Sequence, residues 1–360
     1  MILKQCLFAL AVVSCSTGAT LAQTPARPGN PLATSLASHD SETVVTADER
    51  GKSISVIDTK TGQVITMPVN ITPHNIQVSG DGRKLFAVGA VAAAAHDMKQ
   101  AMDEPGRLIV VRARSVAGGS TADIKVGRNP AHVILNALGT RAFVTNGGDN
   151  TVSVINLARS KTVKTIAVGA SPHGLRMSPD GLSIYIANTA DGSVSVVNTR
   201  SLTEVKRITV GKGPVQVAFT PDGRQVYVSL RDEDSTAVID AAMRKVIATI
   251  KVGPAPIQLY ALPNGREVYV ANQGNEAAPG NTVSIIDVQS QKVVADVVTG
   301  AGAHGVVISK DGSHAFITNT FADTVSEIDT STRQVTRSFP VGPGPGGITF
   351  IPAVADSTKF

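Results

Sequence analysis

A chain of 360 residues with 42% hydrophobic and 17% charged residues has the composition of a folded globular protein and not that of a disordered tail. The formal net charge is +5, but the basic residues are scattered and no run of five like charges occurs, which argues against a nucleic-acid or anionic-membrane surface. Four tyrosines and no tryptophan also leave few aromatic rings on which the bases of a single strand could stack.

Residues 1–22 have the pattern of a secretory signal. Lys4 precedes a short apolar run, and small residues lead up to Ala22, after which we expect cleavage. The alternative is a lipoprotein signal in which Cys15 carries a lipid anchor, and both expectations place the protein in the periplasm or outside the cell. Because Cys6 also lies in this segment, cleavage after Ala22 leaves a mature chain without disulfides, which depends on packing for its stability. We expect a linker over residues 23–40 and find no later apolar stretch of membrane-spanning length.

The rest of the chain repeats a short turn with the pattern "SPDG". Its glycine recurs every 42 residues at Gly139, Gly181, Gly223 and Gly265. Two intervals are wider, 57 residues from Gly82 to Gly139 and 47 from Gly265 to Gly312. We interpret the 15 and 5 additional residues as loop insertions that leave the repeat in phase.

Each repeat contains four short runs rich in Val, Ile and Tyr, which predict four antiparallel strands, or one blade of a β-propeller. The first repeat begins near Ser41 with only three strands, whereas the chain ends with an opening strand that nothing follows, "GPGPGGITFIP" over 342–352. We therefore predict an all-β, seven-bladed propeller over residues 41–352, with a short tail at 353–360. The C-terminal strand near Ile348 is expected to pair beside Val44–Thr46 and to complete the first blade.

The repeat resembles the YVTN family of β-propellers, in segments such as "IYIANTADGSVSVVN", "AFVTNGGDNTVSVIN" and "AFITNTFADTVSEID". This resemblance implies the propeller fold but leaves function open, since the family includes surface-layer proteins, periplasmic proteins reported to bind nucleic acid, and lyase-like relatives. YVTN repeats also resemble the propeller that binds haem d1, which has eight blades, so a count of seven argues against that cofactor. The missing tryptophan argues against WD40 blades and tryptophan-docked quinoprotein propellers.

Three histidines are predicted to surround one end of the channel. The residue after the opening proline of each blade is His74 in blade 2, His173 in blade 4 and His304 in blade 7, where Ala303 replaces the proline. Together they are a candidate site for zinc or another transition metal. The alternative is that "PHG" belongs to the repeat itself, with each histidine bonded to the backbone of a neighbouring blade. His132, one place later in blade 3, is expected to pack between blades.

Both insertions, at 89–107 and 273–280, are predicted on the face that carries these histidines. The first contains His96, Met98 and Met102, a pattern that suits copper or, alternatively, a helix that packs onto the propeller through its methionines. In blade 5, Asp232 and Asp234 are the most acidic stretch of this face and are candidates for a cation site or for solvated side chains.

One asparagine ends the second strand in four of the repeats, and turn chemistry is the expected reason for it. These residues are Asn146, Asn188, Asn272 and Asn319.

Motifs for an enzyme are few. The mature chain has no cysteine nucleophile, and no G-x-S-x-G, H-E-x-x-H or Walker sequence occurs. We therefore expect an exported, non-enzymatic binding or scaffold propeller that meets an unknown protein or small-molecule ligand at the channel mouth. The alternative function is a divalent-metal-dependent lyase or hydrolase, or a metal carrier, that uses the channel-mouth histidines.

Overall fold

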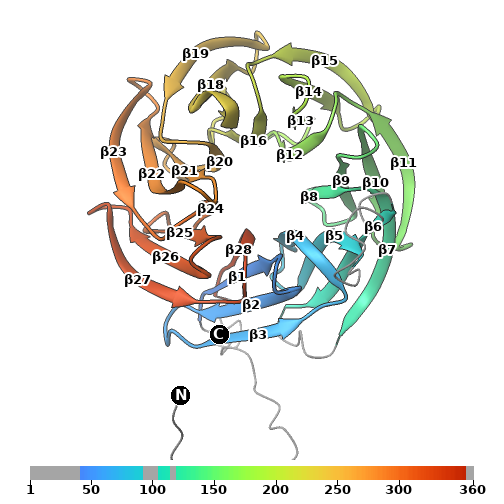
Figure 1. Cartoon of the computed structure of the whole chain (residues 1–360). Helices are drawn as coiled ribbons and strands as arrows, with labels where there is room; N and C mark the ends of the chain where they lie inside the picture. The colour runs from blue at the N-terminus through green and yellow to red at the C-terminus, as the bar shows by residue number, and fades with distance from the viewer. Residues whose placement is uncertain (1–40, 92–103, 114–118, 354–360) are drawn as a thin grey trace, which may run out of the picture. The chain divides into compact units, whose positions relative to one another are not determined.

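The computed structural model describes residues 41–91, 104–113 and 119–353, which form a closed ring of seven four-stranded antiparallel sheets around a central channel (Figure 1). This is the architecture predicted from the repeat. The expected signal segment with Cys15, the linker, most of the blade 2 insertion with His96, Met98 and Met102, and residues 354–360 lie outside the described residues. No helix in the described ranges is long and apolar enough to cross a membrane.

Each blade runs from an inner strand at the channel to an outer strand at the rim. In this order, blade 1 comprises β28 (Pro345–Ile351), β1 (Thr43–Asp48), β2 (Ser53–Asp58) and β3 (Val64–Pro68). Blade 2 comprises β4 (Ile71–Val78), β5 (Lys84–Val91), β6 (Pro105–Arg112) and β7 (Ser120–Arg128). Blade 3 comprises β8 (Pro130–Leu135), β9 (Arg141–Asn146), β10 (Thr151–Asn156) and β11 (Lys161–Ala167). Blade 4 comprises β12 (Pro172–Met177), β13 (Ser183–Asn188), β14 (Ser193–Asn198) and β15 (Thr203–Thr209).

Blade 5 comprises β16 (Pro214–Phe219), β17 (Gln225–Leu230), β18 (Ser235–Asp240) and β19 (Lys245–Lys251), and a short 3-10 helix, η2 (Arg231–Glu233), connects β17 to β18. Blade 6 comprises β20 (Pro256–Ala261), β21 (Glu267–Gly274), β22 (Pro279–Asp287) and β23 (Lys292–Val298). Blade 7 comprises β24 (Ala303–Ile308), β25 (His314–Asn319), β26 (Thr324–Asp329) and β27 (Gln334–Pro340).

The ring closes where the two ends of the repeat region meet. β28 pairs antiparallel with β1, with Ile348 opposite Thr46 and Phe350 opposite Val44 (Figure 1). The predicted pairing of the C-terminal strand with the first blade is therefore confirmed. Because β28 is the inner strand of blade 1, it lies between the inner strands of blades 7 and 2 and places residues 345–351 on the channel.

The hydrophobic core is divided among the contacts between neighbouring blades. Each sheet is too thin to bury its own side chains, so apolar residues on both faces pack against the blades on either side. Between blades 1 and 2, for example, Val45 and Ile54 pack with Ile76 and Leu85, and all four are fully buried. The middle strands are therefore buried on both faces, as in β13, where Ile184 to Asn188 are all buried. The outermost strands carry lysines and arginines at exposed positions, which discourages edge-to-edge pairing.

The asparagine that ends the second strand in four repeats has a structural role different from the expected one. Asn188 is fully buried, and its Nδ2 donates hydrogen bonds of 2.9 Å to Ser193 and Ser195 on the third strand. Asn146, Asn272 and Asn319 make the same pair of bonds. The turn-chemistry interpretation was wrong for these residues, because the asparagine amide ties the second strand to the third inside the blade.

Blade 1 has an aspartate in this position. Asp48 is fully buried and accepts hydrogen bonds from the hydroxyls of Thr46, Ser53 and Ser55. Burial raises the pKa of Asp48, and the three hydroxyl donors oppose this shift only in part. The charged form of Asp48 is therefore less favourable in the folded state than in the unfolded state.

We expect Asp48→Asn to increase the free energy of unfolding at pH 7 by about 1 kcal/mol, because it introduces the amide that blades 3, 4, 6 and 7 carry and removes a buried charge. The folded pKa is raised, so wild-type Asp48 destabilises the fold above that pKa and ceases to do so once it is protonated. The advantage of the variant should shrink as the pH falls through the folded pKa toward the ordinary value for aspartate. Denaturant unfolding of both proteins across this pH range measures the effect.

The reciprocal change in blade 4, Asn188→Asp, is the matched control and should destabilise the protein at pH 7. A lower stability for Asp48→Asn at neutral pH, or a difference independent of pH, would contradict this account of the buried carboxyl.

Candidate metal centre

One end of the channel is formed by the starts of the seven inner strands, each of which contains a β-bulge near its first residues. In β12, His173 and Gly174 together oppose Ala187 of β13, and in β8, Ala131 and His132 together oppose Thr145 of β9. A bulge can re-aim side chains and lets two consecutive residues lie on the same side of a strand. Two successive positions of each inner strand can therefore reach the channel.

His74 and His173 approach each other directly across this end of the channel. Their Nε2 atoms lie 3.1 Å apart, and their rings meet edge to face with centroids 5.1 Å apart. The Nδ1 atom of His74 lies 3.3 Å from the carboxylate of Glu49, and Nδ1 of His173 lies 3.2 Å from the carbonyl oxygen of Val215. Because both Nδ1 atoms face acceptors, each carries a proton, and the Nε2 lone pairs are the groups left to face each other.

His132 completes the cluster from blade 3. Its ring centroid lies 4.9 Å from that of His173 and 5.8 Å from that of His74, and the three histidines each offer one nitrogen within 4.8 Å of the others. His132 is buried, and its Nε2 has no hydrogen-bond partner among the described residues. The expectation that His132 packs between blades is confirmed, because it contacts His74 of blade 2, His173 of blade 4 and Gln216 of blade 5, and these contacts also bring it into the histidine cluster.

Gln216 holds His132 in place from two blades away. Its Nε2 donates to Nδ1 of His132 over 3.3 Å, while its Oε1 accepts from the backbone N–H of Val217. To reach His132 the Gln216 side chain crosses the inner end of blade 4 at Gly174, where a Cβ atom would lie only 2.3 Å from Gln216 Oε1. The glycine of "PHG" is therefore required here by the side chain of the next blade.

His304 lies on the same channel end but outside the three-nitrogen cluster. Both of its ring nitrogens are buried without a hydrogen-bond partner in the described structure, and Gly346 of β28 is its close neighbour. Of the three histidines predicted from the sequence, the structure thus brings His74 and His173 together, and the third histidine of the cluster is His132 instead of His304.

Burial and a single carboxylate set the charges in this region. Burial lowers the pKa of His173 to about 3 and that of His304 to about 4, and it holds the pKa of His132 well below its usual range. His74 behaves differently, because Glu49 outweighs the effect of burial and raises its pKa. Burial acts to raise the pKa of Glu49, but His74 beside it has the larger effect and the pKa is lowered to about 2. His132, His173 and His304 are therefore neutral, which is the form of imidazole that binds metals, and they surround the pair formed by His74 and Glu49.

The predicted site residues in blade 5 have other partners. Asp232 in η2 pairs with Arg231 at 2.8 Å, and Asp234, in a left-handed conformation at φ 47°, accepts a hydrogen bond from the backbone N–H of Ala255. Neither belongs to the histidine cluster. The insertion at 273–280 extends the hairpin of β21 and β22, with Gly274 opposite Pro279, at the end of blade 6 where β20 begins.

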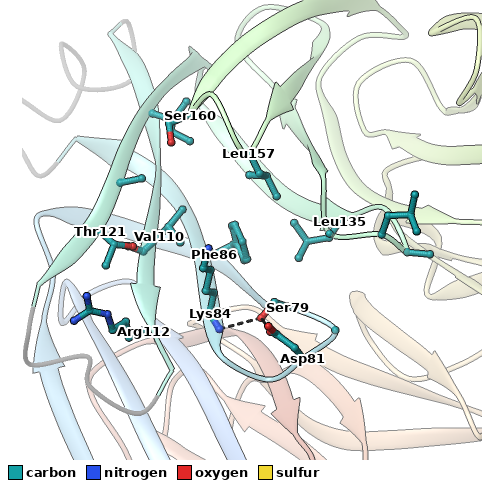
Figure 2. Close-up of a pocket in the computed structure, with 16 residues that line it drawn as sticks. Ser79, Asp81, Lys84, Phe86, Val110, Arg112, Thr121, Leu135, Leu157 and Ser160 are labelled. Atoms are coloured by element: carbon teal, nitrogen blue, oxygen red, sulfur yellow. Dashed lines mark hydrogen bonds between the residues drawn. The ribbon is translucent and has the colours of Figure 1, made fainter.

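A small cavity of about 200 Å³ opens beside the cluster and is lined in part by Glu49, His74 and His173. A larger cavity of about 580 Å³ lies between blades 2 and 3 at their opposite end (Figure 2). Phe86, Leu135 and Leu157 line this larger cavity. Asp81 also lines it, but its carboxylate already accepts hydrogen bonds from Ser79 and Arg83 of the same turn. No histidine in the described part of the chain lines the larger cavity, so the candidate site is the histidine cluster.

Thr145 of β9 connects two of the histidine-bearing strands. Its hydroxyl accepts the N–H of His132 at 3.0 Å and donates to the carbonyl oxygen of His173 at 2.6 Å. Ser229 and Thr318 make the equivalent bridge from blades 5 and 7. This hydroxyl satisfies the N–H freed by the bulge and sets the position of the next blade.

We expect Thr145→Val to lower the free energy of unfolding by about 2 kcal/mol or more, because it leaves a buried N–H and a buried C=O unpaired at nearly unchanged side-chain volume. Denaturant titration gives the change. Thr145→Ser is the matched control, since it keeps the hydroxyl and removes only a methyl group, at about 1 kcal/mol. A Val variant as stable as the Ser variant would contradict the bridging role.

The fold has close counterparts among solved structures. The hydrazine synthase of Kuenenia stuttgartiensis is 21% identical over 76% of this chain and 88% of that chain, with a TM-score of 0.66. A functionally unknown protein from Desulfotomaculum acetoxidans DSM 771 is 14% identical over 87% of this chain and 99% of that one, with a TM-score of 0.70. A protein from Bacteroides fragilis NCTC 9343, named as a candidate 6-phosphogluconolactonase, is 14% identical over 87% and 98%, with a TM-score of 0.71. At these identities the likeness concerns the fold alone.

No curated protein matches the chain in sequence. Two family models match it, the YNCE-like beta-propeller over residues 223–352 and the Cytochrome D1 heme domain over residues 18–266. The second match spans more than half of the chain, which therefore belongs to the cytochrome D1 heme domain family.

The described channel end does not fit a haem, the group that this family name implies, held between His74 and His173. Two axial ligands of a haem lie on opposite faces of the macrocycle. Here the Nε2 atoms of His74 and His173 are 3.1 Å apart with their rings in contact, which leaves no space for a macrocycle between them. The adjoining cavity of about 200 Å³ is also smaller than the ~300–1,000 Å³ of typical small-molecule pockets. The donor set fits a single ion.

Proposed function

We propose that this member of the cytochrome D1 heme domain family is an exported, non-enzymatic binding propeller that holds one transition-metal ion at the end of its channel. His74 and His173 are the primary ligands and His132 is the third. The export part of the proposal rests on the apolar leader with small residues before Ala22.

The observation that carries the metal proposal is the short distance between Nε2 of His74 and Nε2 of His173. Two neutral imidazoles that face each other through Nε2 repel unless a cation lies between them. In the metal-free protein a proton fills this role, since the raised pKa of His74 favours an imidazolium that donates to His173. A metal ion replaces that proton, and its binding releases the proton to solvent.

The separation of the nitrogens agrees with a shared ion. Two nitrogens bound to one metal at about 2.1 Å lie about 3.0 Å apart at a right angle and about 3.4 Å apart at the tetrahedral angle. The observed 3.1 Å falls within this interval. Glu49 and the Val215 carbonyl supply the outer hydrogen bonds that fix the tautomer and the ring orientation of metal-binding histidines.

His132 needs one adjustment before it binds. Gln216 donates to its Nδ1, so the proton of the neutral ring is on Nε2, the nitrogen that has no hydrogen-bond partner among the described residues. Transfer of this proton to Nδ1 frees the Nε2 lone pair, and rotation of the Gln216 amide supplies an acceptor for it. We therefore expect His132 to contribute less to affinity than His173 does.

Binding is favoured over the lyase or hydrolase considered from the sequence. Metal-assisted catalysis of that kind needs a general acid or base that faces an open position on the metal. Among the described residues, the carboxylate beside these histidines is that of Glu49. It contacts Nδ1 of His74, which is the nitrogen on the far side of the ring from the proposed ion. A protein or small-molecule partner would meet the ion through the adjoining cavity, at the channel end that also carries the β21–β22 hairpin.

Titration of metal-stripped full-length protein with Zn²⁺ in a calorimeter should show one ion bound per chain. His173→Gln should weaken binding by about 100-fold or more, because it removes a ligand whose lone pair already faces the site. His132→Gln should weaken binding by about tenfold, whereas His304→Gln should leave the affinity within a few-fold of wild type.

His314→Gln is the matched control, because His314 lies outside the channel in contact with Ser313 and Glu327. Absence of stoichiometric binding to the wild-type protein, or equal affinity in His173→Gln, would overturn the proposal. A loss with His304→Gln as large as that with His173→Gln would replace His132 by His304 in the ligand set.

A further inference from the structure

The opposite end of the channel contains a second cavity, of about 300 Å³, between the ends of three successive inner strands, β12, β16 and β20. The turn prolines Pro179, Pro221 and Pro263 form its outer wall. It lies three residues along β12 from His173, or about 10 Å at the rise of a strand. The cavity is thus separate from the histidine cluster, although both belong to the same channel.

Arg176, Ala218 and Tyr260 are equivalent residues of blades 4, 5 and 6, each three places after the position that His173 occupies in blade 4. The guanidinium of Arg176 lies 5.7 Å from the ring centroid of Tyr260. To reach blade 6 from blade 4, Arg176 passes the inner strand of blade 5, where the small side chain of Ala218 leaves room for it. The residue at this position differs in every blade, and in blades 4, 5 and 6 it lines the cavity.

Arg176 has no carboxylate partner among the described residues. Its Nη1 donates a hydrogen bond of 3.3 Å to the carbonyl oxygen of the adjacent Leu175, whereas an arginine carries five N–H donors. The side chain is only partly exposed, and burial lowers its pKa, although a guanidinium stays charged at any ordinary pH. A cation enclosed in this way is normally paired, because leaving bulk water without a partner is unfavourable.

The surroundings of Arg176 indicate the shape of the missing partner. Tyr260 and Phe219 supply aromatic surface, and the three prolines supply apolar surface. Phe219 is held in place by an edge-to-face contact with Tyr185, with ring centroids 5.1 Å apart. A cavity with one planar fork of donors and aromatic walls is suited to a flat oxyanion that carries an apolar body.

We propose that this cavity binds a small organic oxyanion, a carboxylate or a phosphate ester, whose oxygens accept hydrogen bonds from Arg176 and whose apolar body lies against Tyr260 and Phe219. The site goes beyond the proposed metal-binding function and does not depend on it.

The experiment uses metal-free full-length protein, so that failure of the metal site does not affect the result. Calorimetric titration with benzoate should show saturable binding at one site per chain. Acetate lacks the ring, so its affinity should be lower than that of benzoate by about tenfold or more. Benzyl alcohol lacks the charge and should show no saturable binding. Phenyl phosphate is titrated in parallel, and the tighter of the two aromatic anions identifies the class of oxyanion.

Arg176→Gln should weaken benzoate binding by about tenfold or more, because hydrogen bonds to a charged group are lost. Arg224→Gln is the matched control: Arg224 follows the Pro221 turn at the same end of the ring and is 86% exposed. Arg176→Lys keeps the charge but loses the two-pronged donor geometry and should give an intermediate affinity. It also serves as the test variant if Arg176→Gln fails to fold.

Circular dichroism and thermal unfolding confirm that each variant is folded before titration. No saturable binding of either aromatic anion to the wild-type protein would overturn the proposal. So would benzoate binding that Arg176→Gln and Arg176→Lys leave unchanged, since the anion would then lie elsewhere.

Discussion

The structure depends on the mutual burial of neighbouring blades. A four-stranded sheet with apolar side chains on both faces cannot be stable alone, so each blade needs a neighbour on each side, and only a closed ring provides one for every blade. The pairing of β28 with β1 meets this requirement by joining the two ends of the repeat region in one sheet. Closure also brings the seven inner strands to a common level, so that residues far apart in sequence, such as Glu49 and His173, lie around one channel end.

Within this symmetric frame, residues repeated from blade to blade build the scaffold, and residues that differ between blades supply the chemistry. Thr145, Ser229 and Thr318 use a hydroxyl to satisfy the inner-strand bulge and to hold the next blade. The bulge turns consecutive residues toward the channel, and neighbouring glycines admit side chains from other blades, as Gly174 admits Gln216. Where a blade carries histidine at these positions, neutral nitrogens gather. Where Ala218 replaces a large residue, Arg176 can reach across to Tyr260.

Family membership accounts for the fold of this chain but not for its channel chemistry. The cytochrome D1 heme domain match and the likeness to solved propellers reflect the shared frame, whereas contact between the rings of His74 and His173 excludes a macrocycle from the space between them. The propeller thus presents an ion-sized donor set at one end of its channel and an enclosed cation at the other. Both arise from side chains that the rigid inner strands hold within about 10 Å of each other.

The sequence alone determined the blade count, the four strands of each blade and the closure of the ring, because the 42-residue spacing and the unpaired opening strand are local patterns that admit one arrangement. It also identified His74 and His173, which follow the opening proline of their strands. The inclusion of His132 was decided by the tertiary structure, since a bulge breaks the alternation on which sequence reasoning relies and Gln216 comes from two blades away. The same is true of Arg176 and Tyr260, and of the buried asparagines, whose roles depend on contacts between strands and blades that no single repeat contains.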